Sequence, residues 1–223
     1  LNGRLISAKY AKLESTKTFV TLTDMSIIQK LEMDLEEETK RKKELITKVM
    51  PQNLTLKFMS NQEQGVSFSV QSVTIAMISL CLEEHNDNTI QIFNEVYNSL
   101  DSLIKAKNFQ TIESIEIIGD LFMAIGGLFD EVNQTERHAQ EITRFSLEAL
   151  TKIKAIKEKF NCADINTLCG VAAGGPVYGG VIELDVPIFE VCGDVIDLAE
   201  EMMALGMPDV IHTTRAVYEF IYG

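Results

Sequence analysis

Apolar residues along the larger, C-terminal part of the chain alternate between the spacing of strands and that of helices. A run of apolar residues at 70–81 predicts a buried strand. The next segment, 89–107, is apolar at every third or fourth position, which predicts an amphipathic helix. The apolar face of that helix consists of Ile92, Val96, Leu100 and Ile104.

The remaining elements follow the same two patterns. They are a hairpin over 115–128, a helix over 136–160, strands over 166–173, 177–183 and 188–192, a helix over 194–205, a strand at 210–214 and a final helix from 215. The order strand–helix–strand–strand–helix–strand is that of a ferredoxin-like βαββαβ core. We therefore expect an α+β fold in which this core is expanded by an extra hairpin.

Residues 28–49 have the pattern of a coiled-coil helix. Apolar residues, interrupted by two charged ones, follow spacings of three and four in turn. The positions of this seam are Ile28, Leu31, Leu35, Glu38, Lys42, Leu45 and Val49. A solvated single helix is one interpretation, but we favour a parallel two-helix linker. The linker is expected over 28–50, because Pro51 ends the helix.

The segment before this helix, residues 17–26, reads KTFVTLTDMS, an alternating run followed by an Asp-Met-Ser stop. It resembles the last strand of a PAS sensor domain; the alternative is a short docking strand with no sensor attached. We therefore expect three parts: the end of a PAS-like domain at 1–27, the linker at 28–50, and a globular domain at 51–223. Because the first residue is Leu, we expect a piece of a longer protein.

Charge and composition indicate which partners and which cellular compartment the chain is expected to have. A net charge of −13 excludes nucleic acid as a partner and requires a metal ion between the chain and any anionic ligand. Four scattered cysteines without a C-x-x-C pair predict free, buried thiols in a reducing compartment. The longest apolar run is far shorter than the roughly 20 residues of a bilayer span. We expect a cytoplasmic chain, or the cytosolic part of a membrane protein.

The hairpin at 115–128, IEIIGDLFMAIGGL, carries a carboxylate at its tip. Gly119 and Asp120 form the predicted turn between its two strands. Asp120 should therefore lie at a strand end, where a metal ion or a phosphate can reach it. An Asp in a turn is also ordinary turn chemistry, so the hairpin alone does not establish a site.

Three further segments accompany the hairpin in order: SFSVQSVTIAMISLCLEE before it, and CGVAAGGPVYGGVI and PIFEVCGDVIDLAEEM after it. Together the four segments resemble the catalytic domain of class III nucleotide cyclases, the adenylate and guanylate cyclase family. The resemblance implies a dimer with itself or with a related cyclase domain. It also implies ATP or GTP as substrate, a 3′,5′-cyclic nucleotide and diphosphate as products, and Mg²⁺ or Mn²⁺ as cofactor. The family's last segment, with its phosphate-binding Lys, is not present, so the domain is expected to be C-terminally truncated.

The resemblance places the two metal-binding aspartates of the family at Ser79 and Asp120. Mg²⁺ prefers hard, anionic oxygen ligands, and a serine hydroxyl is a weak, uncharged substitute. The metal pair is therefore expected to be half dismantled. Glu83 and Glu84 are close in sequence and are either replacement ligands or the solvated end of a strand.

The other family positions are also substituted. The purine-reading positions fall on Glu116, which resembles a guanine reader, and on Glu190, which is closer to the Asp of adenine readers, so the base stays open. The Asn and Arg that stabilise the transition state from the partner subunit fall on Asp197 and Glu201. An acidic residue in place of that Arg reverses the sign of its interaction with a triphosphate.

Three functions fit these substitutions. The first, which we favour, is a catalytically impaired cyclase domain, a pseudoenzyme that acts as a dimerising or regulatory output module of a larger signalling protein. The second is one half of a heterodimeric cyclase whose partner supplies the missing groups. The third is an active homodimeric cyclase with a rearranged metal site that recruits Glu83 or Glu84.

Overall fold

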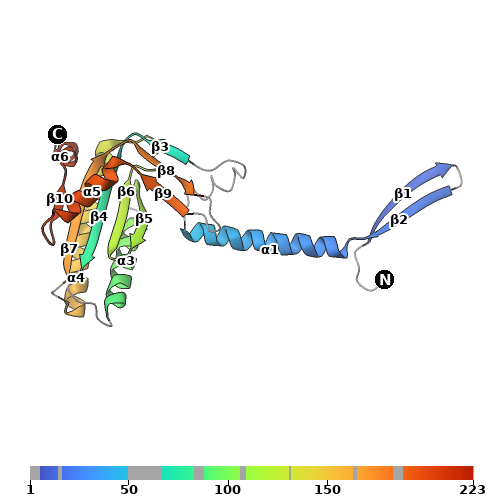
Figure 1. The fold of residues 1–223 in the computed structure, drawn as a ribbon, viewed down its shortest axis with the longest axis horizontal. Helices are drawn as coiled ribbons and strands as arrows, with labels where there is room; N and C mark the ends of the chain where they lie inside the picture. The colour runs from blue at the N-terminus through green and yellow to red at the C-terminus, as the bar shows by residue number, and fades with distance from the viewer. Residues whose placement is uncertain are drawn as a thin grey trace. The chain divides into compact units, whose positions relative to one another are not determined.

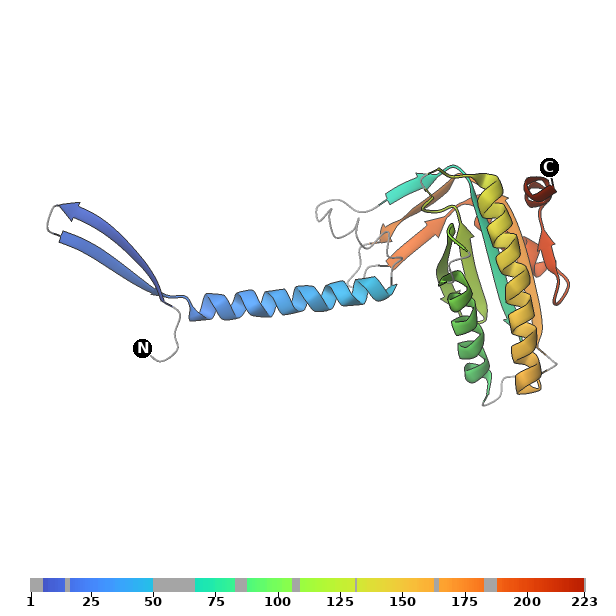
Figure 2. The ribbon, with the colours of Figure 1, turned by 180° about the vertical axis from the view of Figure 1, so that it is seen from behind.

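A computed structural model describes residues 6–14, 17–49, 67–82, 88–105, 109–130, 132–162, 165–182 and 188–222 of the 223-residue chain (Figures 1 and 2). The chain divides into two compact units, Leu1–Val49 and Met50–Gly223. The boundary between the units falls within two residues of Pro51, where the sequence predicts the end of the linker helix.

The first unit is a β-hairpin followed by a long helix. Strand β1 (Ile6–Glu14) pairs antiparallel with β2 (Lys17–Asp24), and α1 runs over Ser26–Val49. The strand at β2 and the helix are as predicted. Strand β1 was missed, because lysines interrupt the apolar alternation of its sequence ISAKYAKLE. Along α1, Leu31 and Leu35 are 62% and 65% exposed, so the first part of the predicted apolar seam is on the surface of this chain.

The second unit is built on the expected βαββαβ core. Its elements are β4 (Val73–Cys81), α3 (Thr89–Lys105), β5 (Ile112–Ile118), β6 (Leu121–Gly126), α4 (Thr135–Phe160) and β7 (Asn166–Gly174). The strands form one sheet in the order β7-β4-β6-β5, with β10 (Ile211–Thr213) added in parallel beside β7. β4 pairs antiparallel with both β6 and β7, so it lies at the centre. The α+β fold class and the ferredoxin-like order are confirmed.

Strand β4 separates two hydrophobic cores. Because side chains alternate along a strand, Ala76, Ile78 and Leu80 lie in the core that α3 and α4 cover. In Figure 2 these two helices run side by side over that face of the sheet. The neighbours Ile75 and Met77 belong to the second core, beneath α5 (Asp194–Ala204).

A smaller sheet of three antiparallel strands extends the second core. It consists of β3 (Ser67–Val70), β8 (Val177–Ile182) and β9 (Ile188–Cys192), in the order β3-β8-β9. The single strand predicted over 70–81 is therefore wrong: the chain leaves the small sheet after Val70 and enters the large one at Val73. At this crossing a Cβ on Gly175 would lie 2.2 Å from the Gln71 carbonyl oxygen, so the two backbones are in contact.

Helix α5 packs directly on the backbone of β7. A Cβ on Gly170 would lie 2.2 Å from the Met203 nitrogen and 2.4 Å from the Ala199 oxygen, so only glycine permits this approach. The C-terminal helix α6 (Arg215–Tyr222) follows β10 and places Val217 in the first core. All four cysteines are free, as predicted, but only Cys169 is buried. Cys81 and Cys162 are half-buried, and Cys192 is exposed.

Candidate functional site

The turn between β5 and β6 presents Asp120 to solvent. Ile118 and Leu121 are the last paired residues of the hairpin, which leaves Gly119 and Asp120 as the two turn residues. Gly119 has φ +60°, a conformation that glycine adopts without strain. The predicted hairpin with a carboxylate at its tip is therefore present, and Asp120 is exposed.

Ser79 lies beside this turn on the neighbouring strand β4. In the β4–β6 ladder Ser79 is opposite Leu121, and the Leu80 N–H donates to the Asp120 carbonyl oxygen at 3.0 Å. The Ser79 hydroxyl donates a hydrogen bond to Asp120 Oδ2 at 2.8 Å. Ser79 itself is only 5% exposed. The two positions that the resemblance assigns to metal binding are thus in direct contact.

The donor set at this contact fits one divalent cation and does not fit a pair. Asp120 supplies one carboxylate, and its other neighbour is a hydroxyl; the Cys81 sulfur lies 3.5 Å from the Ser79 oxygen. Within the described residues, no group of three or more His, Cys, Asp or Glu side chains is placed to hold a metal ion. One Mg²⁺ or Mn²⁺ can use a single carboxylate when water and substrate phosphates complete its shell. A two-ion centre needs a second carboxylate that Ser79 does not provide.

Tyr97, on α3, also contacts the turn. Its hydroxyl donates to the Gly119 carbonyl oxygen at 2.9 Å. Burial, and secondly the negative charge of Asp120, raises the pKa of Tyr97 to about 12, so the phenol is a hydrogen-bond donor at any physiological pH. Sequence reasoning missed this residue. The only signal available was an aromatic pair at positions i and i+4, Phe93 and Tyr97, which is equally typical of a plain core contact.

The two predicted purine-reading positions lie in different sheets. Glu116 is on β5 opposite Met123, next to a β-bulge that follows Ser114; its side chain is outside the described residues. Glu190 is on β9 opposite Gly180 and is exposed. The alternative ligands Glu83 and Glu84 are also outside the described residues.

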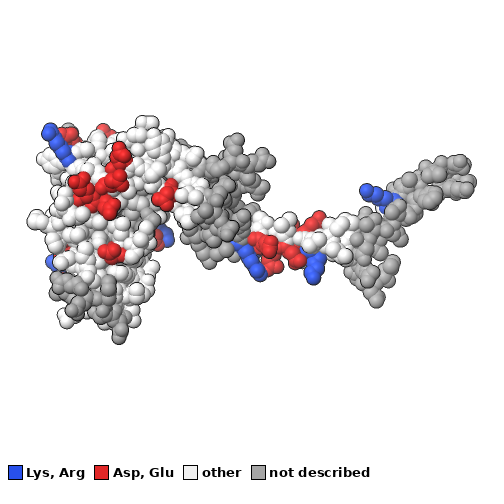
Figure 3. Space-filling view, viewed as in Figure 1, with Lys and Arg blue, Asp and Glu red and all other residues white. Residues whose placement is uncertain are grey.

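Asp197 and Glu201, the predicted transition-state positions, are exposed on α5 and lie one helical turn apart. Asp194 and Glu200 on the same helix are exposed as well. In Figure 3 acidic side chains gather over α5. Since α5 itself carries no Lys or Arg, this surface is unfavourable for anions.

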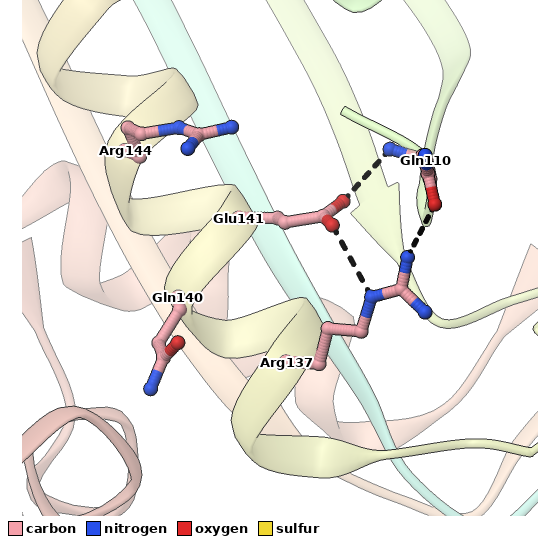
Figure 4. A pocket seen from close by; sticks show the side chains of 5 residues that line it. All are labelled: Gln110, Arg137, Gln140, Glu141 and Arg144. Carbon is pink, nitrogen blue, oxygen red and sulfur yellow. Dashed lines mark hydrogen bonds and ion pairs between the residues drawn. The ribbon is translucent and has the colours of Figure 1, made fainter. Parts of the chain in front are cut away.

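A second polar cluster ties the start of α4 to the start of β5. Glu141 Oε2 accepts hydrogen bonds from the backbone N–H groups of Gln110 and Thr111, both at 2.9 Å, and from the Thr111 hydroxyl at 2.8 Å. Its Oε1 accepts a longer bond, 3.4 Å, from Arg137. The cluster borders a cavity of about 470 Å³ lined by Gln110, Arg137, Gln140, Glu141 and Arg144 (Figure 4). Since both carboxylate oxygens of Glu141 accept hydrogen bonds from other residues of the chain, we interpret the cluster as structural.

His138 is a buried core histidine. Its ring is fully buried, and Nδ1 is 2.8 Å from the Thr74 hydroxyl. Burial is the main influence on its protonation and lowers the pKa to about 4.

Comparison with known proteins identifies the fold and its relatives. Residues 62–222 match the family described as the adenylate and guanylate cyclase catalytic domain. The chain is 28% identical over 212 residues to the germination-specific adenylate cyclase of Dictyostelium discoideum. It is 25% identical over 206 residues to retinal guanylyl cyclase 1 of Mus musculus. The matches cover 92% and 87% of this chain but only 24% and 18% of those proteins.

Solved structures agree. The guanylate cyclase domain of RhGC from Catenaria anguillulae, in complex with GTP, matches with a TM-score of 0.59 and 21% identity, over 70% of this chain and 85% of that one. A bacterial light-regulated adenylyl cyclase matches with a TM-score of 0.65 and 17% identity, over 88% of this chain and 58% of that one. Identities this low establish the fold alone.

No helix in the described part of the chain has the length and apolar character of a membrane span.

The family match covers most of the second unit and well over half of the chain. The chain therefore belongs to the adenylate and guanylate cyclase catalytic domain family.

Proposed function

We propose that this chain is a divergent cyclase domain whose own catalytic centre is impaired, and that it acts as a dimerising, regulatory output module in cyclic-nucleotide signalling. The observation that carries the proposal is the hydrogen bond from Ser79 to Asp120. Two metal ions in such a centre bridge the attacking and leaving oxygens. Here the second carboxylate is replaced by a hydroxyl that points its proton at the first.

Further support comes from the acidic surface of α5. Losing one preorganised charge-stabilising donor costs about 10²- to 10³-fold in rate. Asp197 and Glu201 add two such defects to the one at Ser79, although the effects of residues acting as a unit do not multiply. A homodimer of this chain is therefore expected to be catalytically negligible.

The chain's remaining capacity is to bind one metal ion and to occupy one side of a dimer. Asp120, assisted by the Ser79 hydroxyl, would hold a single Mg²⁺ or Mn²⁺, which would neutralise the phosphates of ATP or GTP. Glu116 and Glu190 would contact the purine. In this scheme residues 1–27 are the end of a PAS-like sensor, 28–50 a coiled-coil linker, and 51–223 the cyclase-like module. The exposed apolar residues of α1 support the dimerising linker.

A second function has one specific observation in its favour. Asp120 is kept, exposed and oriented at its turn, so it would still serve as a ligand if a partner cyclase domain supplied the missing carboxylate, Asn and Arg. This chain would then be one half of a heterodimeric cyclase. The chain spans only 24% and 18% of the length of the two relatives named above, so their activities as whole proteins are not assigned to it.

One experiment separates the two functions. Cyclic AMP and cyclic GMP production is measured for the chain alone, for a related cyclase domain, and for their mixture, with Mn²⁺ and ATP or GTP. The related domain is inactivated by replacing one of its two metal-binding aspartates, and it keeps the other aspartate, its Asn and its Arg. The impaired-module proposal expects no product in any sample. Product that forms only in the mixture, and is lost when Asp120→Asn is used, establishes the heterodimer half. Product from this chain alone refutes the impairment.

A further inference from the structure

The turn that carries Asp120 is held at three points. The Asp120 carboxylate accepts from the Ser79 hydroxyl, and the Asp120 carbonyl oxygen accepts from the Leu80 N–H. The third point is the Gly119 carbonyl oxygen, which accepts from the Tyr97 hydroxyl. We call these three hydrogen bonds tethers. The first two come from the adjacent strand, whereas Tyr97 reaches the turn from α3 and is 22 residues away from Gly119 in sequence.

The third tether is preorganised, because packing fixes the ring of Tyr97. The ring stacks on Phe122 with a centroid separation of 6.1 Å and an interplanar angle of 21°. On its other neighbour, Phe93, the separation is 5.7 Å. Phe122 is fully buried in the first core, so Tyr97 is anchored to the rigid part of the domain. A phenol held between two rings leaves its hydroxyl few other orientations.

The Tyr97 hydroxyl also lies within the electrostatic reach of Asp120. The negative charge of that carboxylate is the second cause, after burial, of the raised pKa of Tyr97. The phenol therefore stays neutral and does not compete for the cation as an anionic ligand. It can therefore contribute to the site only by its hydrogen bond, which holds the peptide group that joins Gly119 to Asp120.

We propose that Tyr97 is a positioning residue: by holding the Gly119 carbonyl it fixes the turn so that the Asp120 carboxylate is kept in the place where it binds a divalent cation. The inference rests on the proposed function in one respect, that Asp120 binds the cation. Without the tether, Gly119 has the freest backbone of any residue and the peptide can rotate. Because Tyr97 lies on α3, the position of this helix then influences how tightly Asp120 binds the cation.

The test compares Mn²⁺ binding by the full chain and by Tyr97→Phe, which keeps the ring and removes only the hydroxyl. Electron paramagnetic resonance measures free Mn²⁺, and the signal that Asp120→Asn retains is subtracted, because a chain of net charge −13 binds cations elsewhere. One net hydrogen bond corresponds to about a two- to tenfold change in a binding constant. Tyr97→Phe should raise the dissociation constant of the Asp120-dependent site by that factor.

A matched variant separates the hydroxyl from the packing. Phe93→Leu weakens the aromatic contact of Tyr97 and keeps its hydroxyl. It should lower the melting temperature without metal more than Tyr97→Phe does. It should weaken Mn²⁺ binding less than Tyr97→Phe does, because the hydroxyl and the contact of Tyr97 with Phe122 remain. Independently of metal, amide hydrogen exchange at Leu80, whose N–H donates to the Asp120 carbonyl oxygen, should be about two- to tenfold faster in Tyr97→Phe than in the unmodified chain.

The outcomes are distinct. If the unmodified chain shows no Asp120-dependent Mn²⁺ site, the metal site of the proposed function fails and the inference fails with it. If that site is present and Tyr97→Phe binds Mn²⁺ as tightly, the positioning role alone is refuted. Equal weakening by Phe93→Leu also refutes it, since packing rather than the hydroxyl would then set the affinity. Unchanged amide exchange at Leu80 in Tyr97→Phe shows that the Tyr97 hydroxyl does not hold the turn, and so refutes the positioning role.

Discussion

Replacing Ser79 with Asp puts a second carboxylate against Asp120, and the structure sets the cost. The Ser79 oxygen is 2.8 Å from Asp120 Oδ2, so two carboxylates at these positions would lie close to 4 Å apart. Two unit charges at 4 Å repel by about 1 kcal/mol in water and about 4 kcal/mol at an effective dielectric constant of 20. Solvent around the exposed Asp120 screens part of this repulsion, whereas Ser79 is only 5% exposed, so about 1–2 kcal/mol is the minimum cost.

Thermal unfolding in EDTA should reveal this cost as a melting temperature lowered by at least about 2–8 °C, at 2–4 °C per kcal/mol for a domain of this size. Ser79→Asn is the matched control, because it has nearly the same size and polarity without the charge. Adding MnCl₂ should raise the melting temperature of Ser79→Asp well above that of Ser79→Asn, since two carboxylates now share one cation.

Two results would refute the reasoning. Equal stability of Ser79→Asp and Ser79→Asn in EDTA would mean that the added carboxylate does not face Asp120. An equal response of both variants to Mn²⁺ would mean that these two positions do not form a metal site.

Three other predictions concern the scaffold. Leu31→Ser combined with Leu35→Ser should shift the chain from dimer toward monomer in sedimentation velocity, because both side chains lie exposed on the proposed α1 seam; an unchanged sedimentation coefficient contradicts the coiled coil. His138 has a pKa lowered by burial to about 4 from an ordinary value of 6.5, so its neutral form is favoured by folding and the unfolded chain binds the proton first. Unfolding free energy from urea titrations should therefore fall as the pH is lowered from 6.5 to 4, and His138→Gln should flatten that slope. Glu141→Gln should destabilise the domain by about 1–3 kcal/mol because three donors lose a charged acceptor, whereas Glu148→Gln, with a 44% exposed side chain, should change it by less than about 0.5 kcal/mol.

The spacing of apolar residues predicted most of the helices and strands, because the residues that recur at that spacing are the ones that the fold buries. The apolar face predicted for the helix at 89–107 is the buried face of α3, from Ile92 to Ile104. The pattern failed at the start of β4, where the polar pair Gln71-Ser72 was included in the predicted strand although it marks the break between Val70 and Val73. The backbone of this pair lies against Gly175 at the point where the chain passes from the small sheet to the large one.

The candidate site divides in the same way. The resemblance predicted that Ser79 and Asp120 would meet, 41 residues apart, because the order of segments determines which strands pair. Tyr97 was not predicted, since its hydroxyl bonds a carbonyl of another element and no spacing along α3 records that. The roles of Glu116 and Glu190, and those of Asp197 and Glu201, are still predictions.

The central strand also constrains how this domain can change in length. The even-numbered residues of β4 lie in one core and the odd-numbered ones in the other. A single inserted or deleted residue would therefore move each side chain beyond it to the opposite face of the sheet. Ser79 would then turn toward the helices α3 and α4, and Leu80 would take the place beside Asp120. The distance in sequence from Val73 to Ser79 is therefore expected to be invariant in any working descendant of this chain.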